Sequence, residues 1–369
     1  MILEKNQEVF FALLKAGLWD KEVCLSMYDD IDYSELFTIA EEQSVLGVIT
    51  AGLEQVKDVK IPQEWILQFI GSTLQIEQRN KSMNQFVSKL VALLRAADIY
   101  ALLVKGQGIA QCYDKPLWRA AGDVDLYLSK ENYEKAKSYL IPLAQNIEQE
   151  DKNRLHLGMT IESWNVELHG SMHSGLSKKM NRVSDEVHNS IFYGENIRSW
   201  NNNGVQIFLP SANNDIIIIF NHFIDHFYGE GIGLRQVCDW CRLLWLYKNN
   251  IDLWLLESRI RKEGLMIEWK AFGFFSVEFL GMPKAIMPFY EDSSSYRRKS
   301  NKICKLILET GSFGHNKSYN YRKTSSKFKS NVITLWRRFG EFSRIAIIFP
   351  YNAPKYFITY VLGRVKAVS

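Results

Sequence analysis

The sequence predicts an α+β protein in which a small mixed β-sheet with flanking helices lies between two helical parts. Residues 1–98 show apolar residues at spacings of three and four, with no strand pattern among them. Residues 99–210 contain short apolar or alternating runs, which are typical of strands. Helical spacing returns after residue 210. We therefore expect an N-terminal helical region at 1–98, a sheet-containing core at 99–210, and a C-terminal helical region at 211–369.

The N-terminal region has three helical stretches. They read "QEVFFALLKAGLW", "YSELFTIAEEQSVLGVITAGLEQV" and "QEWILQFIGSTLQIEQRNKSMNQFVSKLVALLRAADI". The core then begins with the buried strand "IYALLV" (99–104), followed by a short helix, "GIAQCYD", and the turn-rich "KPLWRAAG". The next strand is "DVDLYL", after which Ser129 is suited to cap the helix "ENYEKAKSYLIPLA".

Residues 154–170, "RLHLGMTIESWNVELHG", are typical of a β-hairpin, with two alternating runs around "ESWN". A further strand, "VQIFL" (205–209), precedes Pro210. From there to about residue 285 the pattern is helical. The segment 311–331 is rich in Gly, Ser, Asn and Lys, which favours a linker.

Two strands of the core carry acids in the same phase. Asp123 and Asp125 alternate with Val124 and Leu126, so the acids share one face and the apolar residues share the other. Glu167 has the same phase in the second arm of the hairpin. Three clustered carboxylates repel one another and need a cation. Oxygen ligands favour Mg²⁺ or Mn²⁺, which bind through a few carboxylates and substrate phosphates.

A glycine turn lies upstream of these acids. "VKGQGIAQCY" predicts a strand that passes through a tight turn into a short helix, where free backbone N–H groups can hold an anion. Lys105 and Arg119 flank the same place. Metal-binding carboxylates together with a cationic turn for phosphates are the parts needed for phosphoryl or nucleotidyl transfer.

These motifs resemble a known family. "LLVKGQGIAQCYDKPLWRAAGDVDLYL" (102–128) followed by "VELHG" is similar to the uncharacterised nucleotidyltransferase family of the DNA polymerase β-like nucleotidyltransferase superfamily. Members read roughly L-K-G, then R-x-x-G-D-[IV]-D-[LV], then [VI]-E-L-H. The similarity continues weakly through 221–244, "EEQSVLGVI" and "FPYNAPKYFITYVLGRV".

The resemblance implies roles for individual residues. Asp123 and Asp125 would bind the metals, and Glu167 would be the third carboxylate, which helps to hold the catalytic metal and orients or deprotonates the acceptor hydroxyl. It implies Mg²⁺-dependent transfer of a nucleoside monophosphate from a nucleoside triphosphate (ATP or another NTP) to an acceptor hydroxyl. The acceptor stays unidentified, and a small molecule is favoured over protein or RNA.

The resemblance also implies phosphate contacts. Lys105 and Gly106 stand where the superfamily has a Gly-Ser turn at the phosphates, and Arg119 would neutralise the triphosphate. The chain departs from the pattern here, because the Ser is absent and Gly106 lies seventeen residues before Asp123.

Four histidines have alternative interpretations. His169 lies on the acid face, as a site residue or as the partner of a carboxylate, and His156 is similar. His222 and His226 are four residues apart on one helix face. They could bind zinc, one could contact the nucleotide or the acceptor, or both could be structural.

The helix after 233 offers two further pairs. Arg235 and Asp239 have the spacing of a helix-stabilising ion pair, although the resemblance allows a base or ribose contact. Cys238 and Cys241 form a C-x-x-C within a helical pattern, which favours core thiols over a metal or redox site.

The charge distribution leaves other functions open. The net charge is +4, but 297–338 holds twelve Lys or Arg and one acid. This basic segment would serve an RNA-modifying (tRNA) nucleotidyltransferase, and a catalytically inactive nucleotide-binding module is a further alternative. Five scattered cysteines, the early charges Glu4, Lys5 and Glu8, and apolar runs no longer than "IIIIF" favour a cytoplasmic protein without stable membrane insertion. The tail "WRRFGEFSRIAIIF" favours helices packed on the body over a membrane-surface helix.

Overall fold

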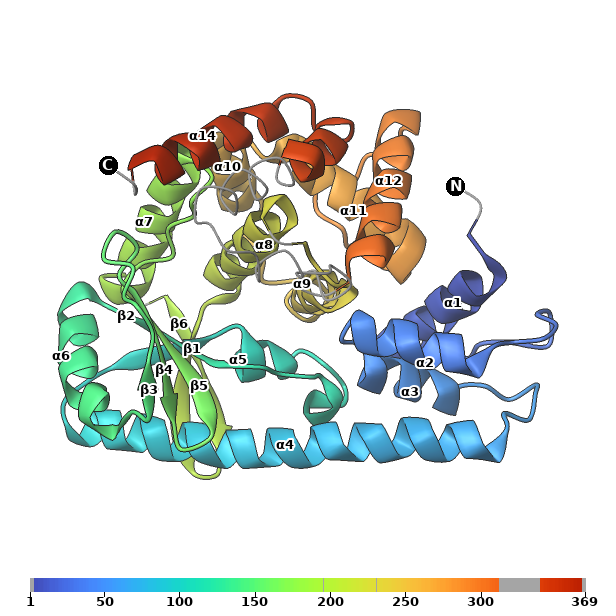
Figure 1. Ribbon diagram of the computed structural model, residues 1–369, viewed down its shortest axis with the longest axis horizontal. Helices are drawn as coiled ribbons and strands as arrows, with labels where there is room; N and C mark the ends of the chain where they lie inside the picture. Colours follow the sequence, from blue (N-terminus) through green and yellow to red (C-terminus); the bar gives the residue numbers. More distant parts are fainter. Residues whose placement is uncertain (1–2, 195, 230, 312–338, 367–369) are drawn as a thin grey trace, which may run out of the picture.

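The computed structural model describes residues 3–194, 196–229, 231–311 and 339–366. In Figure 1 the sheet lies over one end of the long helix α4, helices α1, α2 and α3 lie near its other end, and the later helices lie above both. The N-terminal helices are α1 (Lys5–Trp19), α2 (Tyr33–Glu42), α3 (Leu46–Glu54) and α4 (Gln63–Ala96). The strands are β1 (Ala101–Val104), β2 (Val124–Leu128), β3 (Asn146–Ile147), β4 (His156–Ile161), β5 (Trp164–His169), β6 (Ile197–Asn202) and β7 (Val205–Pro210).

Helices also lie between these strands and after them. Those within the core are α5 (Gly106–Ala110), α6 (Lys130–Leu140) and α7 (Lys178–Phe192), with short 3-10 turns at Pro116–Trp118 and Ile141–Leu143. The later helices are α8 (Ala212–Tyr228), α9 (Leu234–Leu246), α10 (Leu253–Glu263), α11 (Met266–Leu280), α12 (Ser294–Thr310) and α14 (Asn352–Lys366). The fold is thus α+β with a mixed sheet, as the sequence predicts.

The sheet has the strand order β3-β4-β5-β2-β1-β7-β6 among the described residues. Strands β2 and β5 are parallel neighbours, and β1 and β7 are parallel as well. The other neighbours are antiparallel, including the hairpin of β4 and β5. The parallel register places Asp125 beside Glu167, and Tyr127 beside His169. The two acidic strand faces therefore meet at the middle of the sheet.

The two faces of the sheet have different neighbours. On one face, Val124, Leu126 and Val166 pack with apolar residues of α4 and α6, such as Phe86 and Tyr133. Figure 1 shows α4 running along this side. Alternation sends the residues between them to the opposite face, which lies toward α7, α8 and α9. The sheet is therefore anchored by one face and presents its polar side chains on the other.

The N-terminal helices and the C-terminal helices share one hydrophobic core. Gln43, after α2, links them directly: its amide Nε2 donates to the Ile307 carbonyl at 3.2 Å, and its Oε1 accepts from the Leu234 N–H at 3.1 Å. Helix α4 contributes Phe69 to this shared core and Met83 to the core beneath the sheet. The division at residues 98 and 210 stays a prediction about chain organisation, because both helical parts pack together across it.

Several local predictions are confirmed. The hairpin, the "VQIFL" strand and the helices after 211 lie where expected, and the Ser129 hydroxyl accepts from the Asn132 N–H as an N-cap. Buried Phe342, Phe349 and Tyr356 show that the described part of the tail packs on the body. The structure adds β3, β6 and α7. The expected linker at 311–331 lies almost entirely outside the described residues, as does the basic segment beyond α12. No helix in the described ranges has both the length and the apolar character needed to cross a membrane.

Candidate active site

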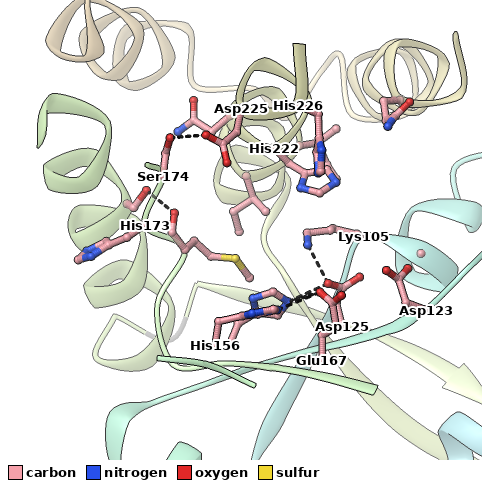
Figure 2. Close-up of a pocket in the computed structure, with 18 of the residues that line it drawn as sticks. Lys105, Asp123, Asp125, His156, Glu167, His173, Ser174, His222, Asp225 and His226 are labelled. Atoms are coloured by element: carbon pink, nitrogen blue, oxygen red, sulfur yellow. Dashed lines mark hydrogen bonds and ion pairs between the residues drawn. The ribbon is translucent and has the colours of Figure 1, made fainter. Parts of the chain in front are cut away.

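A cavity of about 380 Å³ lies between the polar face of the sheet and helices α8 and α9. Figure 2 shows the two sides of this cavity facing each other. We call one side the sheet wall, and it consists of Lys105, Asp123, Asp125, His156, Glu167 and His169. We call the other side the helical wall, and it consists of Asn221, His222, Asp225, His226, Arg235, Gln236 and Asp239. Every site residue expected from the sequence lines this cavity, including Gly106 and Arg119.

The three carboxylates expected to share one face do lie together. Asp125 and Glu167 are register partners on β2 and β5, and Asp123 directly precedes β2. One oxygen from each of Asp123, Asp125 and Glu167 lies within 4.8 Å of the others. Such a set of oxygen ligands suits Mg²⁺ or Mn²⁺.

Lys105 brings a positive charge to this cluster. Its Nζ lies 2.7 Å from the Asp125 Oδ1, and its backbone has the unusual angles φ 56° and ψ −146°. Gly106 follows with φ 36°, and a Cβ there would lie 3.3 Å from the Asp123 carbonyl oxygen. The turn between β1 and α5 is therefore tight against Asp123, and Lys105 is one of nine described non-glycine residues at positive φ.

Two histidines support the carboxylates from the hairpin. The His169 Nε2 lies 2.8 Å from the Asp125 Oδ1 and 3.4 Å from the Glu167 Oε2. The His156 Nε2 lies 3.2 Å from the same Glu167 oxygen. Burial and the Lys105 charge lower the pKa of His169, but its bonds to the two carboxylates outweigh them, so the pKa is raised. His169 therefore orients both acids as a proton donor.

The acids themselves have different protonation behaviour. Burial would raise the pKa of Glu167, but hydrogen bonds from His156 and His169 outweigh it and lower the pKa. The charge of Asp125, followed by burial, raises the pKa of Asp123 to about 6. Asp123 thus experiences repulsion that the neighbouring Lys105 does not remove.

Arg119 joins the chain before β2 to the helical wall. Its Nε and Nη2 donate to the two carboxylate oxygens of Asp239 at 3.1 and 2.5 Å, and both side chains are buried. The Asn80 amide donates to the Arg119 carbonyl oxygen at 2.8 Å, which fixes this segment to α4. Arg235 donates to the Ala120 carbonyl oxygen at 2.8 Å. Asp239 is thus paired with Arg119, and phosphate binding by Arg119 stays a prediction.

His222 lies across the cavity from the acids, on α8 (Figure 2). Its ring centroid is 4.5 Å from that of His226, in an edge-to-face arrangement. Burial, and then the charges of Lys105 and His226, hold the pKa of His222 well below its usual range. Neither histidine belongs to a group of three metal-capable side chains among the described residues. His222 is therefore placed as a neutral polar group beside His226, and the pair has no third zinc ligand among the described residues.

The sequence interpretation did not assign several lining residues, among them Asn221, Asp225 and Ser174. A signal for two of them exists in "NDIIIIFNHFIDHFY", where polar residues recur at one-turn spacing on an otherwise apolar helix. Ser174 lies in a loop without periodicity, and it reaches the site only through the fold. Its hydroxyl donates to the Asp225 Oδ1 at 2.7 Å. Cys238 and Cys241 are buried, as expected for core thiols.

Known proteins resemble the chain to different degrees. The crystal structure of an antigenic nucleotidyltransferase-like protein from Paracoccidioides brasiliensis is 13% identical, covers 48% of this chain and 85% of its own, and has a TM-score of 0.31. That overall likeness is too low to show a shared fold. No curated protein matches the chain. A family model described as "Uncharacterised nucleotidyltransferase" matches residues 29–267, which include both walls of the cavity. The chain therefore belongs to this uncharacterised nucleotidyltransferase family.

Proposed function

We propose that the protein transfers a nucleoside monophosphate from a nucleoside triphosphate to an acceptor hydroxyl, with Mg²⁺ or Mn²⁺ as cofactor. The observation that carries this proposal is the cluster of Asp123, Asp125 and Glu167 beside the Lys105 ammonium. The residues fit a divalent ion, because the donors are all carboxylate oxygens and Asp123 has a pKa raised to about 6 by the uncompensated negative charge.

The three carboxylates would hold the ion, which would supply neutralisation of the charge on the triphosphate oxygens. Lys105 would bind the phosphates from the turn at Gly106. His156 and His169 keep Glu167 oriented and ionised, so that its oxygen can accept a hydrogen bond from the acceptor hydroxyl. In the reaction, the acceptor oxygen forms a bond to the α-phosphorus, and the bond from that phosphorus to the bridging oxygen breaks. Pyrophosphate leaves with the electron pair, and the hydroxyl proton is released.

The first experiment incubates the protein with each α-³²P-labelled triphosphate and Mg²⁺, with and without cell extract. A labelled product and released pyrophosphate are expected, and EDTA should abolish both. The absence of product with all triphosphates, together with tight nucleotide binding, would instead identify a non-catalytic module. A labelled RNA product that is lost at high salt would identify an RNA acceptor.

Glu167→Gln tests the assignment of the third carboxylate. We expect turnover to fall by roughly 10²–10³-fold, the scale of losing one preorganised electrostatic contact, while nucleotide affinity changes little. Glu162→Gln is the matched control, because Glu162 is exposed at the turn of the same hairpin. Single-turnover rates and calorimetric affinities measure the two effects. An affinity loss as large as the rate loss would contradict the acceptor-directed role of Glu167.

A further inference from the structure

Two histidines of the hairpin form a second cluster with Glu167. His156 of β4 and His169 of β5 are register partners, and Glu167 lies two residues before His169, so all three side chains face the cavity. One ligand atom from each of them lies within 4.8 Å of the others. Because β5 lies between β4 and β2, this histidine cluster lies beside the carboxylate cluster and shares Glu167 with it.

Both histidines direct a nitrogen at the same oxygen atom. The Nε2 atoms of His156 and His169 lie 3.2 and 3.4 Å from the Glu167 Oε2. The longer distance exceeds the usual hydrogen-bond range of about 2.7–3.2 Å. Ligand atoms bound at about 2.0–2.1 Å to a tetrahedral zinc ion, however, lie about 3.3–3.4 Å from one another. The two distances therefore fit two edges of a tetrahedral coordination shell.

The donor atoms distinguish the histidine cluster from the carboxylate cluster. Imidazole nitrogens suit Zn²⁺ and similar transition-metal ions, whereas Mg²⁺ prefers oxygen ligands. Two histidines and one glutamate are also a known ligand set of zinc sites that keep one position open. Among the described residues, this is the one group of three metal-capable side chains that includes a histidine.

An ion can reach the histidine cluster from the cavity. The side chains of His156 and Glu167 are 31% and 30% exposed, and that of His169 is 10% exposed. Figure 2 shows the His156 ring beside Glu167 on the cavity side of the strands. An ion bound by the three side chains would therefore have its open position directed toward a ligand in the cavity.

Binding of an ion would replace one existing contact of His169. Its Nε2 lies 2.8 Å from the Asp125 Oδ1, and that oxygen also lies 2.7 Å from the Lys105 Nζ. If His169 turns its nitrogen toward an ion, Asp125 keeps Lys105 as its partner. The exchange therefore leaves no buried carboxylate without a cation beside it, which is the costly outcome for a buried charge.

We propose that His156, Glu167 and His169 form a second metal site, which takes a transition-metal ion of the Zn²⁺ or Co²⁺ class. Glu167 has two carboxylate oxygens, so one side chain can serve both this site and the carboxylate cluster. The inference goes beyond the proposed function and does not depend on it, because it is based on the geometry of the hairpin and not on nucleotide transfer.

The test titrates Zn²⁺, Co²⁺ and Mg²⁺ separately into the metal-free full-length protein. Calorimetry measures the affinities, and visible absorption reports the coordination of Co²⁺. We expect the absorption of tetrahedral Co²⁺ in the wild type. We expect His156→Ala to remove it and to weaken Zn²⁺ binding by at least about 10-fold, equal to ~1.4 kcal/mol. The Mg²⁺ affinity should change by less than about 3-fold, because His156 is not one of the three carboxylates.

His173→Ala is the matched control. His173 lines the same cavity and lies 2.8 Å from the Asp185 carboxylate, but it belongs to neither cluster. This variant should keep the Zn²⁺ affinity of the wild type. Asp123→Asn separates the two clusters, since it should weaken Mg²⁺ binding more than Zn²⁺ binding. Melting curves confirm that the variants fold, and His156→Gln replaces His156→Ala if the latter does not.

Several outcomes would overturn the second metal site. They are a wild type that binds no Zn²⁺ or shows no tetrahedral Co²⁺, a Zn²⁺ affinity that survives the loss of His156, and an equal loss in His173→Ala. Zn²⁺ binding that depends on Asp123 but not on His156 would place the ion in the carboxylate cluster instead.

Calorimetric titration with a triphosphate, measured separately, tells the two proposals apart. Nucleotide transfer in a protein whose Zn²⁺ binding does not depend on His156 sinks only the second metal site. Zn²⁺ binding through His156, in a protein that binds no triphosphate, supports the second metal site and sinks the proposed transfer.

Discussion

The carboxylates on the two walls of the cavity have different partners. On the sheet wall, Asp125 and Glu167 each have a cationic or histidine partner within 3.2 Å. On the helical wall, Asp239 is paired with Arg119, whereas Asp225 accepts from the Ser174 hydroxyl and has no salt bridge among the described residues. The sheet wall therefore pairs Asp125 and Glu167 with cationic or histidine side chains, but the charge of Asp125 and burial still raise the pKa of Asp123 to about 6. Under the proposed function, the metal cluster belongs to the strands and the turn at Lys105, and the facing side of the cavity belongs to helices α8 and α9.

Removing the ion pair between Arg119 and Asp239 should have the largest effect on stability. Arg119→Ala removes the cationic partner of the buried Asp239, which keeps only its hydrogen bond from the Tyr113 hydroxyl at 2.8 Å, so we expect the free energy of unfolding to fall by about 3–5 kcal/mol. Urea unfolding measures this change. Arg154→Ala is the control, because its pair with Asp151 at 3.6 Å is partly exposed and should contribute about 0–1 kcal/mol. A loss of less than about 1 kcal/mol for Arg119→Ala would show that the walls are not joined through this pair.

The ion pair between Lys105 and Asp125 on the sheet wall can be tested by replacing Lys105. Its Nζ lies 2.7 Å from the Asp125 Oδ1 and competes with a metal ion for that oxygen. We expect Lys105→Gln to tighten Mn²⁺ binding without nucleotide by about 10-fold, a change of ~1.4 kcal/mol, and to weaken triphosphate binding. Calorimetry measures both affinities. Lys115→Gln, which removes an exposed lysine paired with Glu54, should change neither of them. Weaker Mn²⁺ binding in Lys105→Gln would contradict the competition.

Asp123→Asn should give the smallest change in stability, and the size of that change depends on pH. The pKa is raised to about 6 in the folded protein, so the wild type loses stability as pH rises from that of an unfolded aspartate, near 4, through 6. Asp123→Asn removes this loss. Without metal, the variant should be more stable at pH 8 by about 1 kcal/mol after solvent screening, and the gain should vanish near pH 4.

Melting curves at the two pH values, with and without Mg²⁺ and a triphosphate, provide the measurement. The wild type should gain stability from the ligands, and Asp123→Asn should gain little. A variant that melts earlier without metal and still shows the full ligand shift would remove Asp123 from the metal site.

The sheet wall could be predicted from the sequence, because a strand alternates its faces with a period of two. That period places Asp125 and Glu167 on one side and their apolar neighbours on the other. The face on which β2 and β5 each carry their acids could be predicted, but the fact that the two strands are parallel neighbours is known only from the fold. The strand β6 had no such signal, since "IRSWNN" has no apolar face, and it is mostly exposed. Helix α7 has apolar residues at helical spacing, but the sequence analysis did not assign a helix there.

The helical wall could be predicted only in part. His222 and His226 were recognised by their spacing, but the Asn221 amide donates to Glu263, which lies 42 residues later. The partner of Arg119 is Asp239, 120 residues away, whereas local spacing favoured Arg235 as the partner of Asp239. Contacts between separate elements are decided by packing, which no local period encodes.

The length of helix α4 limits where residues could be inserted into the chain. Its 34 residues span about 51 Å at 1.5 Å per residue, with Phe69 in one core and Met83 in the other. None of residues 74–79, between these cores, is fully buried. Substitutions of the exposed Leu74, Gln75 and Gln78 should be tolerated, but inserting a single residue would turn one half by about 100° relative to the other. Each half would then present the wrong side to its core. The middle of α4 therefore acts as a spacer whose length is constrained far more strongly than its composition.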